Sequence, residues 1–480
     1  MGKDLAWASA AKLAKGYRKK RFSPVEATEA VLARIAALNG ELNAFNVVDA
    51  EGARAAAKAS ERRWLKGEPK GLLDGVPVSV KDLILWAGHP TLRGSRTIDP
   101  AQAVAVDAPS VARLKDHGAV IVGKTTTPEF GWKGVTDSPL TGITRNPWDL
   151  TKTPGGSSGG ASAAVAAGMA PLALGTDGGG SIRIPAAFSG IVGHKPSFGR
   201  VPAWPPSPFA SVAHVGPMTR TVEDAALLLT VLSEPDPRDW FALPYEARDY
   251  TQGLTKGIEG FRVAFAPTFG GAEVDPEIGR LVRQAVKVLK DLGAKVEETD
   301  PGLGNPVDTF RTIWWSGVRA LLGAMPAEKR ALVDPDLQDV YRQAQAFTID
   351  DLQAALIRRA EYGSKIRQFM AGFDLLVTPT LPIPAFEVGM VAPKVDGTGK
   401  WVDWTPFTYP FNLTLQPACS VPCGFTKAGL PAGLQIVGRM YDDVSVLRAA
   451  YAYEQAQPWR KMHPPLAMKA AKAEKTPEPA

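Results

Sequence analysis

Short β-like runs alternate with helical stretches along most of the chain. This alternation constrains the possible folds more than any other feature of the sequence. Runs of the length and apolar content of buried strands lie at 75–80, 119–122, 172–174, 262–266, 375–378, 419–421 and 434–437. Helical patterns lie between them, for example at 111–115, 278–292 and 349–369. Strands that alternate with helices pack as a sheet covered on both faces. The sequence therefore predicts an α/β protein, a single large α/β/α sandwich with a central mixed β-sheet flanked by helices.

The two ends of the chain differ in their structural signals. Residues 23–26 read Ser-Pro-Val-Glu, which combines an N-cap serine, a proline at the first helical position and an acidic first turn. An alanine-rich helical pattern follows over 51–65 and ends before Gly67. By contrast, residues 469–480 lack apolar anchors larger than alanine, so we expect a disordered tail there.

Composition argues against several classes of protein. The chain has 55 Lys and Arg against 49 Asp and Glu, and its one dense basic run is at 17–21, so no nucleic-acid partner is indicated. Residues 1–22 lack the apolar core of a signal peptide, and the stretch 161–174 is shorter than the ~20 residues that a membrane span needs. Cys419 and Cys423 are the only cysteines, which argues against a disulfide framework and a metal site. We expect a cytoplasmic protein that binds neither membrane nor metal.

Residues 118–125 satisfy the phosphate-loop pattern literally, with Gly118, Gly123, Lys124 and Thr125 at the required positions. The four inner residues, however, read Ala-Val-Ile-Val, which is a buried-strand sequence. A phosphate loop needs a bent backbone whose N–H groups surround the phosphate. We therefore expect a strand here, with Lys124 near its end.

A second motif, Gly155-Gly-Ser157-Ser-Gly159, matches the nucleophile elbow of α/β-hydrolases. That mechanism requires an acid and then a histidine further along the chain. The downstream histidines are His194, His214 and His463. His194 and His214 follow no clear acid in that order, and His463 lies near the tail between Met462 and Pro464. A histidine-based serine hydrolase thus remains a weakly supported alternative, and we expect these histidines to be structural or exposed.

Two glycine-rich serine loops suggest a third interpretation. Residues 155–160 precede the alanine-rich helical stretch 161–170, and residues 175–185 follow the next β-like run. Consecutive glycines allow positive φ angles and present a row of backbone N–H donors, which suits an oxyanion hole. Each loop by itself is also compatible with an ordinary tight turn.

Taken with Lys81, which follows a β-like run, the two loops resemble the amidase signature family. The matching segments are Val78-Ser-Val-Lys81-Asp82, Gly155-Gly-Ser157-Ser-Gly-Gly160 and Asp177-Gly-Gly-Gly-Ser181-Ile-Arg183-x-Pro185. The two serines are 24 residues apart, the spacing that this family requires. The resemblance covers about 71–220 and returns at 373–380 and 417–438.

The resemblance implies roles for individual residues. Ser181 would be the nucleophile, Ser157 the bridging serine beside a cis peptide bond, and Lys81 the base. The N–H groups of Gly178, Gly179, Gly180 and Ser181 would form the oxyanion hole, while Asp177 and Arg183 would support the loop. The sequence departs from the family's usual residues at Gly178, where many relatives carry a larger side chain, and at His194, which we expect to pack rather than react.

The proposed base works only as a neutral amine. With an ordinary pKa of ~10.4, about one lysine in 2,500 is neutral at pH 7. Lowering that pKa by ~3 units requires ~4 kcal/mol of destabilisation of the ammonium, which burial at a strand end can supply. The neighbouring Asp82 would oppose this shift, but strand alternation sends adjacent side chains to opposite faces. We therefore predict that Asp82 points away from Lys81 and from the serines.

The resemblance also implies a domain division and a reaction. An amidase domain would span 1–468, with a catalytic core at 71–220 and a peripheral, helix-rich, substrate-selecting part at 235–369. The expected reaction is hydrolysis of a carboxylic amide to the acid and ammonia or an amine through a Ser181 acyl-enzyme, without a cofactor. Homodimers are common in the family, so a homodimer is the implied assembly.

Aromatic residues suggest the nature of the small-molecule substrate. Phe130 and Trp132 are the candidate substrate-binding residues, and further aromatic residues stand at Trp204, Trp314, Trp315 and 404–409. Such walls would suit an apolar or aryl acyl group, although each residue taken singly could equally belong to the core. The alternative function is the glutamine-hydrolysing subunit of a tRNA-dependent amidotransferase, which would use the same serines and lysine and require partner subunits.

Overall fold

An eleven-stranded sheet forms the centre of the computed structural model, which describes residues 5–393, 399–459 and 461–468. The predicted tail at 469–480 lies outside the described residues. The strand order across the sheet is β1 (Phe45–Val48), β3 (Val120–Thr125), β2 (Pro77–Lys81), β6 (Leu172–Asp177), β8 (His214–Thr219), β7 (Val192–Lys195), β12 (Ala418–Phe425), β13 (Pro431–Gly438), β11 (Leu375–Pro379), β9 (Arg262–Phe265) and β10 (Lys295–Glu298). A separate pair is formed by β4 (Asp137–Ser138) and β5 (Gly142–Ile143).

The sheet is mixed, as predicted. Strands β3, β2 and β6 run parallel to one another, as do β11, β9 and β10. The strands between these two groups pair antiparallel. Each of the seven predicted β-like runs overlaps one of these strands, and residues 118–125 form the end of a turn and β3 rather than a phosphate loop.

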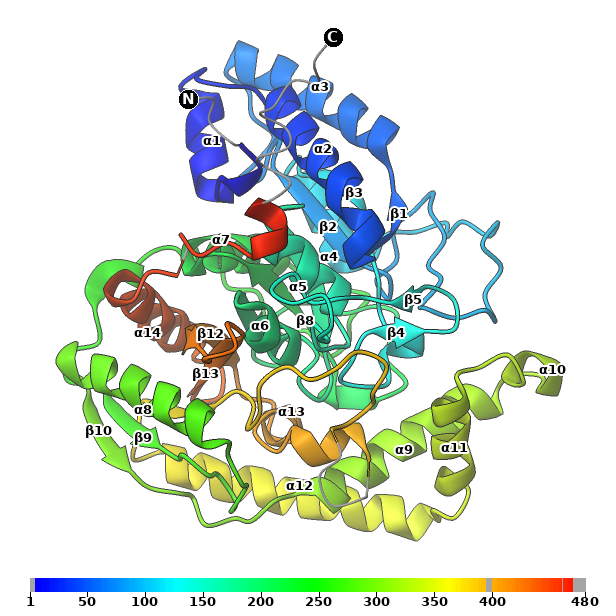
Figure 1. The fold of residues 1–480 in the computed structure, drawn as a ribbon, viewed down its shortest axis with the longest axis vertical. Coiled ribbons are helices and arrows are strands. Elements are labelled where there is room, and N and C mark those ends of the chain that lie inside the picture. The colour runs from blue at the N-terminus through cyan, green and yellow to red at the C-terminus, as the bar shows by residue number, and fades with distance from the viewer. Residues whose placement is uncertain (1–4, 394–398, 460, 469–480) are drawn as a thin grey trace.

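The helices cover both faces of the sheet (Figure 1). They are α1 (Ala10–Arg18), α2 (Pro24–Leu42), α3 (Ala50–Lys66), α4 (Pro109–Asp116), α5 (Gly159–Ala166), α6 (Arg183–Ser189), α7 (Val222–Leu232), α8 (Pro276–Asp291), α9 (Val307–Gly323), α10 (Ala327–Arg330), α11 (Pro335–Ala344), α12 (Ile349–Met370), α13 (Pro410–Leu413) and α14 (Asp443–Ala456). The predicted start of α2 is confirmed, because Ser23 and Glu26 each accept the other's backbone N–H in a capping box.

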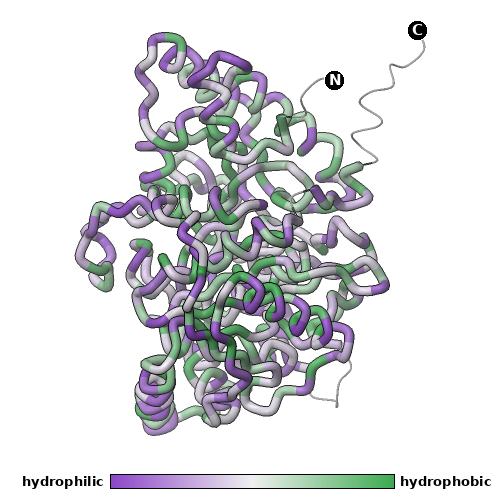
Figure 2. The backbone as a smooth tube through the Cα atoms, turned by 90° about the vertical axis from the view of Figure 1, so that its left-hand side faces the viewer, coloured by the Kyte–Doolittle hydropathy of each residue, from purple (hydrophilic) through white to green (hydrophobic). Residues whose placement is uncertain are grey.

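Alternation along the strands divides the core into two layers. Leu172 and Leu174 of β6 pack in the core on the side of α4, α7, α8 and α14. Ala173, between them, packs with Met218 of β8 against α5 and α6. Successive side chains of a strand point to opposite faces, so each strand contributes to both layers. Figure 2 shows the hydrophobic residues gathered mainly in the middle of the molecule.

The segment 235–369 contributes to the sheet as well as to its periphery. Its strands β9 and β10 form one edge of the central sheet; the sequence predicted the β-like run at 262–266 but not β10. Its helices α9, α11 and α12 contact one another and extend along the lower side of Figure 1. Their apolar residues join the same buried cluster as Phe130 and Trp132, so this segment packs directly against the part of the chain that carries the predicted site.

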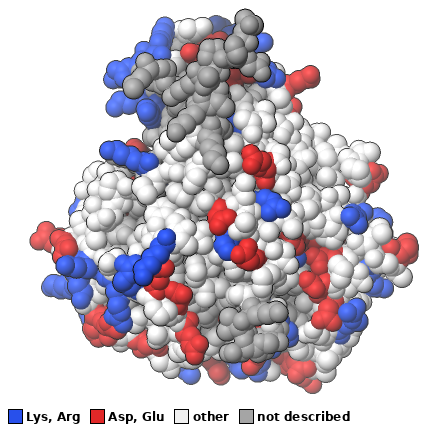
Figure 3. All heavy atoms as spheres, in the orientation of Figure 1, with Lys and Arg blue, Asp and Glu red and all other residues white. Residues whose placement is uncertain are grey.

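Charge is distributed over the surface without a single dominant sign on the face drawn in Figure 3. Lys and Arg are most frequent near the N-terminal helices, while both signs alternate around the lower half. Within the described residues, every helix is too short or too polar to cross a bilayer.

Removing a side chain from the layered core tests this packing. We predict that Leu174→Ala, at a position with 0 % exposure, lowers the free energy of unfolding by about 2–5 kcal/mol because it leaves a cavity. The change is measurable from denaturant or thermal unfolding midpoints. Leu65→Ala, at a position with 61 % exposure, is the control and should change stability by about 0.5 kcal/mol at most. Equal effects of the two substitutions would contradict the assigned core.

Candidate active site

Lys81 is the last residue of β2 and lies inside the protein. Val78 and Val80 of the same strand pack in the apolar core on one face of the sheet. Alternation therefore directs Lys81 to the opposite face, where α5 begins. The Lys81 side chain has 0 % exposure, so its amine is removed from solvent.

Three hydroxyl groups surround the Lys81 amine. Its Nζ lies 2.7 Å from Ser157 Oγ, 2.9 Å from Ser158 Oγ and 2.9 Å from Thr176 Oγ1. The two serines precede α5, and Thr176 stands near the end of β6, the strand parallel to β2. Burial lowers the pKa of Lys81 well below its ordinary value, while the charge of Asp177 opposes this shift.

The loop that carries Ser157 is tightly enclosed. The peptide bond between Gly156 and Ser157 is cis, in agreement with the expectation from the sequence. A Cβ atom on Gly156 would lie 2.5 Å from the Val135 carbonyl oxygen, so this position accepts only glycine without rearrangement. The Ser158 N–H donates to the Ser181 carbonyl at 3.1 Å, which joins this loop to the loop of the predicted nucleophile.

The second glycine loop presents backbone donors beside Ser181. Among the described residues, the N–H groups of Gly178, Gly179 and Ser181 have no hydrogen-bond partner. The Gly180 N–H differs from the prediction, because it donates to Asp177 Oδ1 at 2.8 Å and is already engaged. Glycine at position 178, a departure from the family's usual pattern, has a structural reason: a Cβ there would lie 2.7 Å from Trp314 Cζ3.

Asp177 and Arg183 hold this loop from behind. Arg183 Nε donates to Asp177 Oδ2 at 3.0 Å, and its other nitrogens donate to Gln435 and Asn412 at 2.7 Å each. Burial alone would raise the pKa of Asp177, but the charge and hydrogen bonds of Arg183 outweigh it and hold the pKa below its usual range. Both side chains have 0 % exposure, and neither lines the adjacent cavity.

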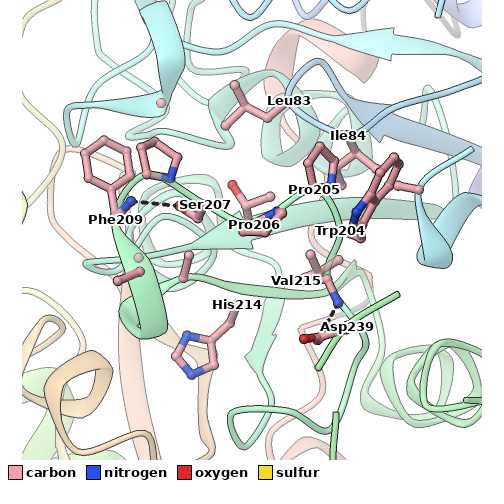
Figure 4. Close-up of a pocket in the computed structure, with 18 of the residues that line it drawn as sticks. Leu83, Ile84, Trp204, Pro205, Pro206, Ser207, Phe209, His214, Val215 and Asp239 are labelled. Atoms are coloured by element: carbon pink, nitrogen blue, oxygen red, sulfur yellow. Dashed lines mark hydrogen bonds between the residues drawn. The ribbon is translucent and has the colours of Figure 1, made fainter. Parts of the chain in front are cut away.

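A cavity of about 280 Å³ opens in front of the two serines. Ser157, Ser181 and Gly178 line it, and Lys81 lies behind Ser157, outside the lining. Its other walls are largely apolar or aromatic and include Leu83, Ile84, Phe130, Trp204, Pro205, Phe209, Val215 and Trp314. Figure 4 shows Leu83 and Ile84 on one side of the segment that carries Trp204 and Phe209, with His214 and Val215 on the other.

Only part of the predicted aromatic wall lines this cavity. Phe130, Trp204 and Trp314 line it, as the sequence suggested. Trp132 does not line it, although it is buried in the same core cluster as Phe130 and Trp314. Trp315 lies in the same cluster. Adjacent residues on a helix point in different directions, so Trp314 reaches the cavity while Trp315 packs away from it.

Comparison with known proteins identifies the family of this chain. A family model described as Amidase matches residues 26–447. An acylamidase of Rhodococcus erythropolis is 38% identical over 472 residues, covering 96% of this chain and 98% of its own. The chain belongs to the amidase signature family. As an amidase, the protein is a hydrolase of carbon–nitrogen amide bonds.

Two further relatives of this amidase extend the comparison. The crystal structure of a bacterial aryl acylamidase of the amidase signature family superimposes with a TM-score of 0.89 and 33% identity, covering 98% of this chain and 99% of its own. A glutamyl-tRNA(Gln) amidotransferase subunit of Gloeobacter violaceus is 37% identical over 477 residues, covering 94% of this chain and 97% of its own.

Asp82 of the amidase is paired away from the site, as predicted. Its Oδ1 lies 2.7 Å from Lys124 Nζ, and both side chains have 0 % exposure. Asn46 donates to its second oxygen at 2.7 Å. Burial raises the pKa of Asp82, and the nearby Lys124 opposes this shift. The carboxylate next to Lys81 in sequence is therefore neutralised by another lysine on the far face of the strand.

The histidines of the amidase give no support to the nucleophile-elbow alternative. His194 is buried and lies 3.1 Å from Asp443, through Nε2 and Oδ1, which agrees with the packing role expected for it. His214 lines the cavity, but its Nδ1 faces the Asp177 and Val212 carbonyls. In the part of the chain that the structure describes, Ser157 and Ser181 have no imidazole partner.

Two hydroxyl partners of the amine, Ser158 and Thr176, were not singled out from the sequence. Ser158 follows Ser157 directly in the matched motif, and Thr176 precedes Asp177 in the other, so both were present without an assigned role. The signal that could have found them is the parallel pairing of β2 and β6, which brings Thr176 beside the end of β2.

No group of three or more metal-ligating His, Cys, Asp or Glu side chains occurs among the described residues.

Breaking the Asp82–Lys124 pair should be costly because both charges are buried. We predict that Asp82→Asn lowers the free energy of unfolding by about 3–5 kcal/mol, since it leaves the Lys124 ammonium uncompensated. The double variant Asp82→Asn/Lys124→Met should lose less, because no buried charge remains. Denaturant unfolding measures both changes.

The exposed pair of Glu29 and Arg54 provides the matched control. Glu29→Gln should leave the unfolding midpoint nearly unchanged, because solvent screens this pair. If Asp82→Asn lowered the free energy of unfolding no more than Glu29→Gln, the predicted cost of leaving a buried charge unpaired would be wrong.

Proposed function

We propose that this amidase hydrolyses acyl amides through a covalent intermediate on Ser181, with Ser157 as the bridging proton carrier and Lys81 as the base. The observation that carries the proposal is the buried Lys81 amine, 2.7 Å from Ser157 Oγ, directly behind the cavity that Ser157 and Ser181 line. A serine hydroxyl is a weak nucleophile at neutral pH and needs such a base within reach.

The three hydroxyl groups around Lys81 can accommodate a neutral amine, the form that burial of this side chain favours. Ser158 Oγ donates to the Thr176 carbonyl at 3.2 Å, so it can only accept a hydrogen bond from Lys81. A neutral amine has two N–H donors and one lone pair. It can donate to Ser158 and Thr176 and use its lone pair to accept the proton of Ser157. This arrangement leaves the lone pair of Lys81 directed at the bridging serine.

Acylation then proceeds as a proton relay. Ser181 Oγ attacks the amide carbonyl carbon while its proton passes to Ser157, and the proton of Ser157 passes to Lys81, which becomes an ammonium. The carbonyl oxygen becomes an oxyanion, for which the N–H groups of Gly178, Gly179 and Ser181 are the available donors. When the carbon–nitrogen bond breaks, the relay returns a proton to the leaving nitrogen, because an amine leaves poorly as an anion.

Deacylation uses the same groups in the opposite sense. A water molecule takes the place of the amine and attacks the Ser181 ester, while Ser157 and Lys81 accept its proton. The second oxyanion collapses, the carboxylic acid is released, and Ser181 regains its proton through Ser157. Asp177 and Arg183 act as positioning residues that hold the oxyanion loop in place.

The cavity favours a small substrate with an apolar or aryl group. Its volume of about 280 Å³ and the aromatic side chains Phe130, Trp204, Phe209 and Trp314 support this choice. The acylamidase of Rhodococcus erythropolis and the bacterial aryl acylamidase are relatives over almost the whole chain. We therefore assign the protein an acylamidase activity on small amides.

A second candidate function is supported by the amidotransferase relative. The chain is 37% identical to the glutamyl-tRNA(Gln) amidotransferase subunit of Gloeobacter violaceus and covers 97% of it. In this alternative, the same serines and lysine would release ammonia from glutamine for partner subunits. The two functions differ in whether the isolated chain is active.

The remaining sequence expectations extend this proposal. We assign the amidase domain to 1–468, with the catalytic core at 71–220 and substrate selection to 235–369, which contributes Trp314 to the cavity. We also propose a cytoplasmic homodimer. Cys419 and Cys423 are both buried free thiols, which is typical of a reducing compartment.

Removing the nucleophile tests the assignment of Ser181. We predict that Ser181→Ala lowers kcat/KM for an anilide and for a primary amide by about 10⁴-fold or more, and abolishes covalent labelling by a serine-reactive phosphonate. Steady-state kinetics and intact-protein mass spectrometry measure the two effects. Ser162→Ala is the control, because Ser162 is buried nearby on α5 without lining the cavity. Substantial turnover by Ser181→Ala protein would refute the mechanism.

The same assay distinguishes the two candidate functions. The acylamidase proposal requires that the purified chain alone hydrolyses simple amides. Inactivity that added amidotransferase subunits relieve, with glutamine as the substrate, would favour the alternative.

The pH dependence should report the neutral form of Lys81. Because burial lowers the pKa of Lys81, kcat/KM should rise with pH through that lowered pKa and reach a plateau well below the ordinary lysine value of ~10.4. Values of kcat/KM from pH 5 to 10 measure this rising limb of the pH–rate profile. An activity that rises only near pH 10 would contradict a neutral buried base.

A second buried lysine provides the control for that limb. Burial lowers the pKa of Lys195 to about 7, and its Nζ lies 3.3 Å from Nε2 of the cavity residue His214. Lys195→Met protein should keep the limb if Lys81 causes it. If kcat/KM of that variant no longer rose with pH, the titrating group would be Lys195 rather than Lys81.

A further inference from the structure

Among the described residues, three charged side chains line the catalytic cavity, and two of them are already engaged. Arg238 donates to Asp236 at 2.6 Å, and Asp239 accepts the backbone N–H groups of Ala203 and Phe241 at 2.8 and 2.9 Å. The third, Arg93, has no hydrogen-bond or ion-pair partner for its guanidinium within the described part of the chain. It is the cation of this wall that remains available to a ligand.

The backbone holds Arg93 in this position at a conformational cost. Arg93 has a φ of 55° and Phe130 a φ of 53°, both in the left-handed region that non-glycine residues rarely adopt. The Phe130 N–H donates to the Arg93 carbonyl at 2.8 Å, and the Arg93 N–H donates to the Asp82 carbonyl at 3.1 Å. Strained residues of this kind persist where the surroundings fix them, and they cluster at ligand sites.

This strained pair borders the reacting groups. A Cβ atom on Gly131, the residue after Phe130, would lie 2.7 Å from Leu83 Cδ1 and 3.2 Å from Ser157 Oγ. Arg93, Phe130, Gly131 and Ser157 all line the same cavity. A molecule whose amide meets the serines therefore lies in the same cavity as the Arg93 guanidinium.

We propose that Arg93 forms a carboxylate subsite, and that the preferred substrates are amides that carry a carboxylate besides the amide bond. A planar guanidinium binds a carboxylate through two parallel hydrogen bonds. A partly buried cation without a counter-ion is costly, and a bound carboxylate offsets that cost. The aromatic wall would then contact the apolar part of the same substrate.

Arg93 is a specificity residue, distinct from the groups that carry the reaction. This subsite rests on the proposed function, because it names the substrate class of the same cavity. The charge of Asp82 also acts on Arg93, but Asp82 forms its ion pair with Lys124, at 2.7 Å, and leaves the Arg93 guanidinium without one in the part of the chain that is described. His214, another titratable residue of the lining, faces the Asp177 and Val212 carbonyls through Nδ1.

Matched pairs of substrates test the subsite. Succinanilic acid and its methyl ester differ only in a carboxylate on the acyl side, and 4-acetamidobenzoic acid and its methyl ester differ only on the amine side. For at least one pair, the wild-type protein should hydrolyse the anilide bond of the acid with the higher kcat/KM. In Arg93→Gln protein, that acid-to-ester ratio should fall by about 10- to 100-fold. Arg93→Lys should restore part of it.

Arg96 provides the control because it is exposed and lies three residues further along the same loop. Arg96→Gln removes the same charge and should leave the acid-to-ester ratio unchanged. An equal fall in both variants would indicate a general effect of surface charge and would overturn the subsite. A ratio near one in wild-type protein for both pairs, or one that Arg93→Gln leaves unaltered, would also overturn it.

A binding measurement separates this inference from the proposed mechanism. Succinanilic acid and 4-acetamidobenzoic acid are each titrated into Ser181→Ala protein and into Ser181→Ala/Arg93→Gln protein. At least one of the two acids should bind at least about tenfold more tightly to the protein that keeps Arg93. This difference does not depend on turnover. If wild-type protein hydrolysed the neutral ester while the binding difference was absent, the acylamidase assignment would stand and the carboxylate subsite would fail. If binding differed while wild-type protein hydrolysed no amide, the subsite would stand and the proposed function would fail.

Discussion

Burial of the Lys81 amine is the constraint on which the site depends. An amine removed from water must exchange its hydration for protein hydrogen bonds, and here Ser157, Ser158 and Thr176 provide all of them. Those hydroxyls reach the end of β2 only because the loop before α5 folds tightly over it and because β6 runs parallel to β2. The chemistry of the base, the glycine content of the loop and the strand order thus follow from one requirement.

The placement of nearby carboxylates also keeps the buried Lys81 amine without an ion-pair partner among the described residues. Two of them are close to Lys81 in sequence or space, and either would favour the ammonium if it paired with that amine. Asp82 pairs instead with Lys124 at 2.7 Å, and Asp177 pairs with Arg183 at 3.0 Å. Each carboxylate has its own cation, so desolvation dominates at Lys81 and its pKa falls. The two buried ion pairs therefore contribute to the reactivity of the base without contacting it.

The sequence predicted what local patterns determine and failed where distant segments decide. Apolar runs located the seven predicted strands, and alternation along β2 correctly separated Asp82 from Lys81. Strand β8 was missed because Gly216 and Pro217 interrupt its β pattern, and the edge strand β10 because it is exposed and charged. Trp132 is not among the residues that line the cavity, and it packs in a cluster with residues of α9 and α11, far along the chain. The hydrogen bond from the Gly180 N–H to Asp177, by contrast, is a local contact between residues three apart, which the glycine pattern alone does not reveal.

Burial has opposite consequences for the two kinds of cation around this cavity. A lysine amine loses its proton when desolvation costs a few kcal/mol, so an enclosed lysine without a counter-ion becomes a base. A guanidinium keeps its proton under the same conditions because its pKa is far higher, so an enclosed arginine without a counter-ion remains a fixed positive charge. Lys81 and Arg93 border the same turn at Asp82, which accepts the Arg93 N–H and follows Lys81 in sequence. One environment can therefore supply a neutral base for the reaction and a permanent cation for substrate recognition.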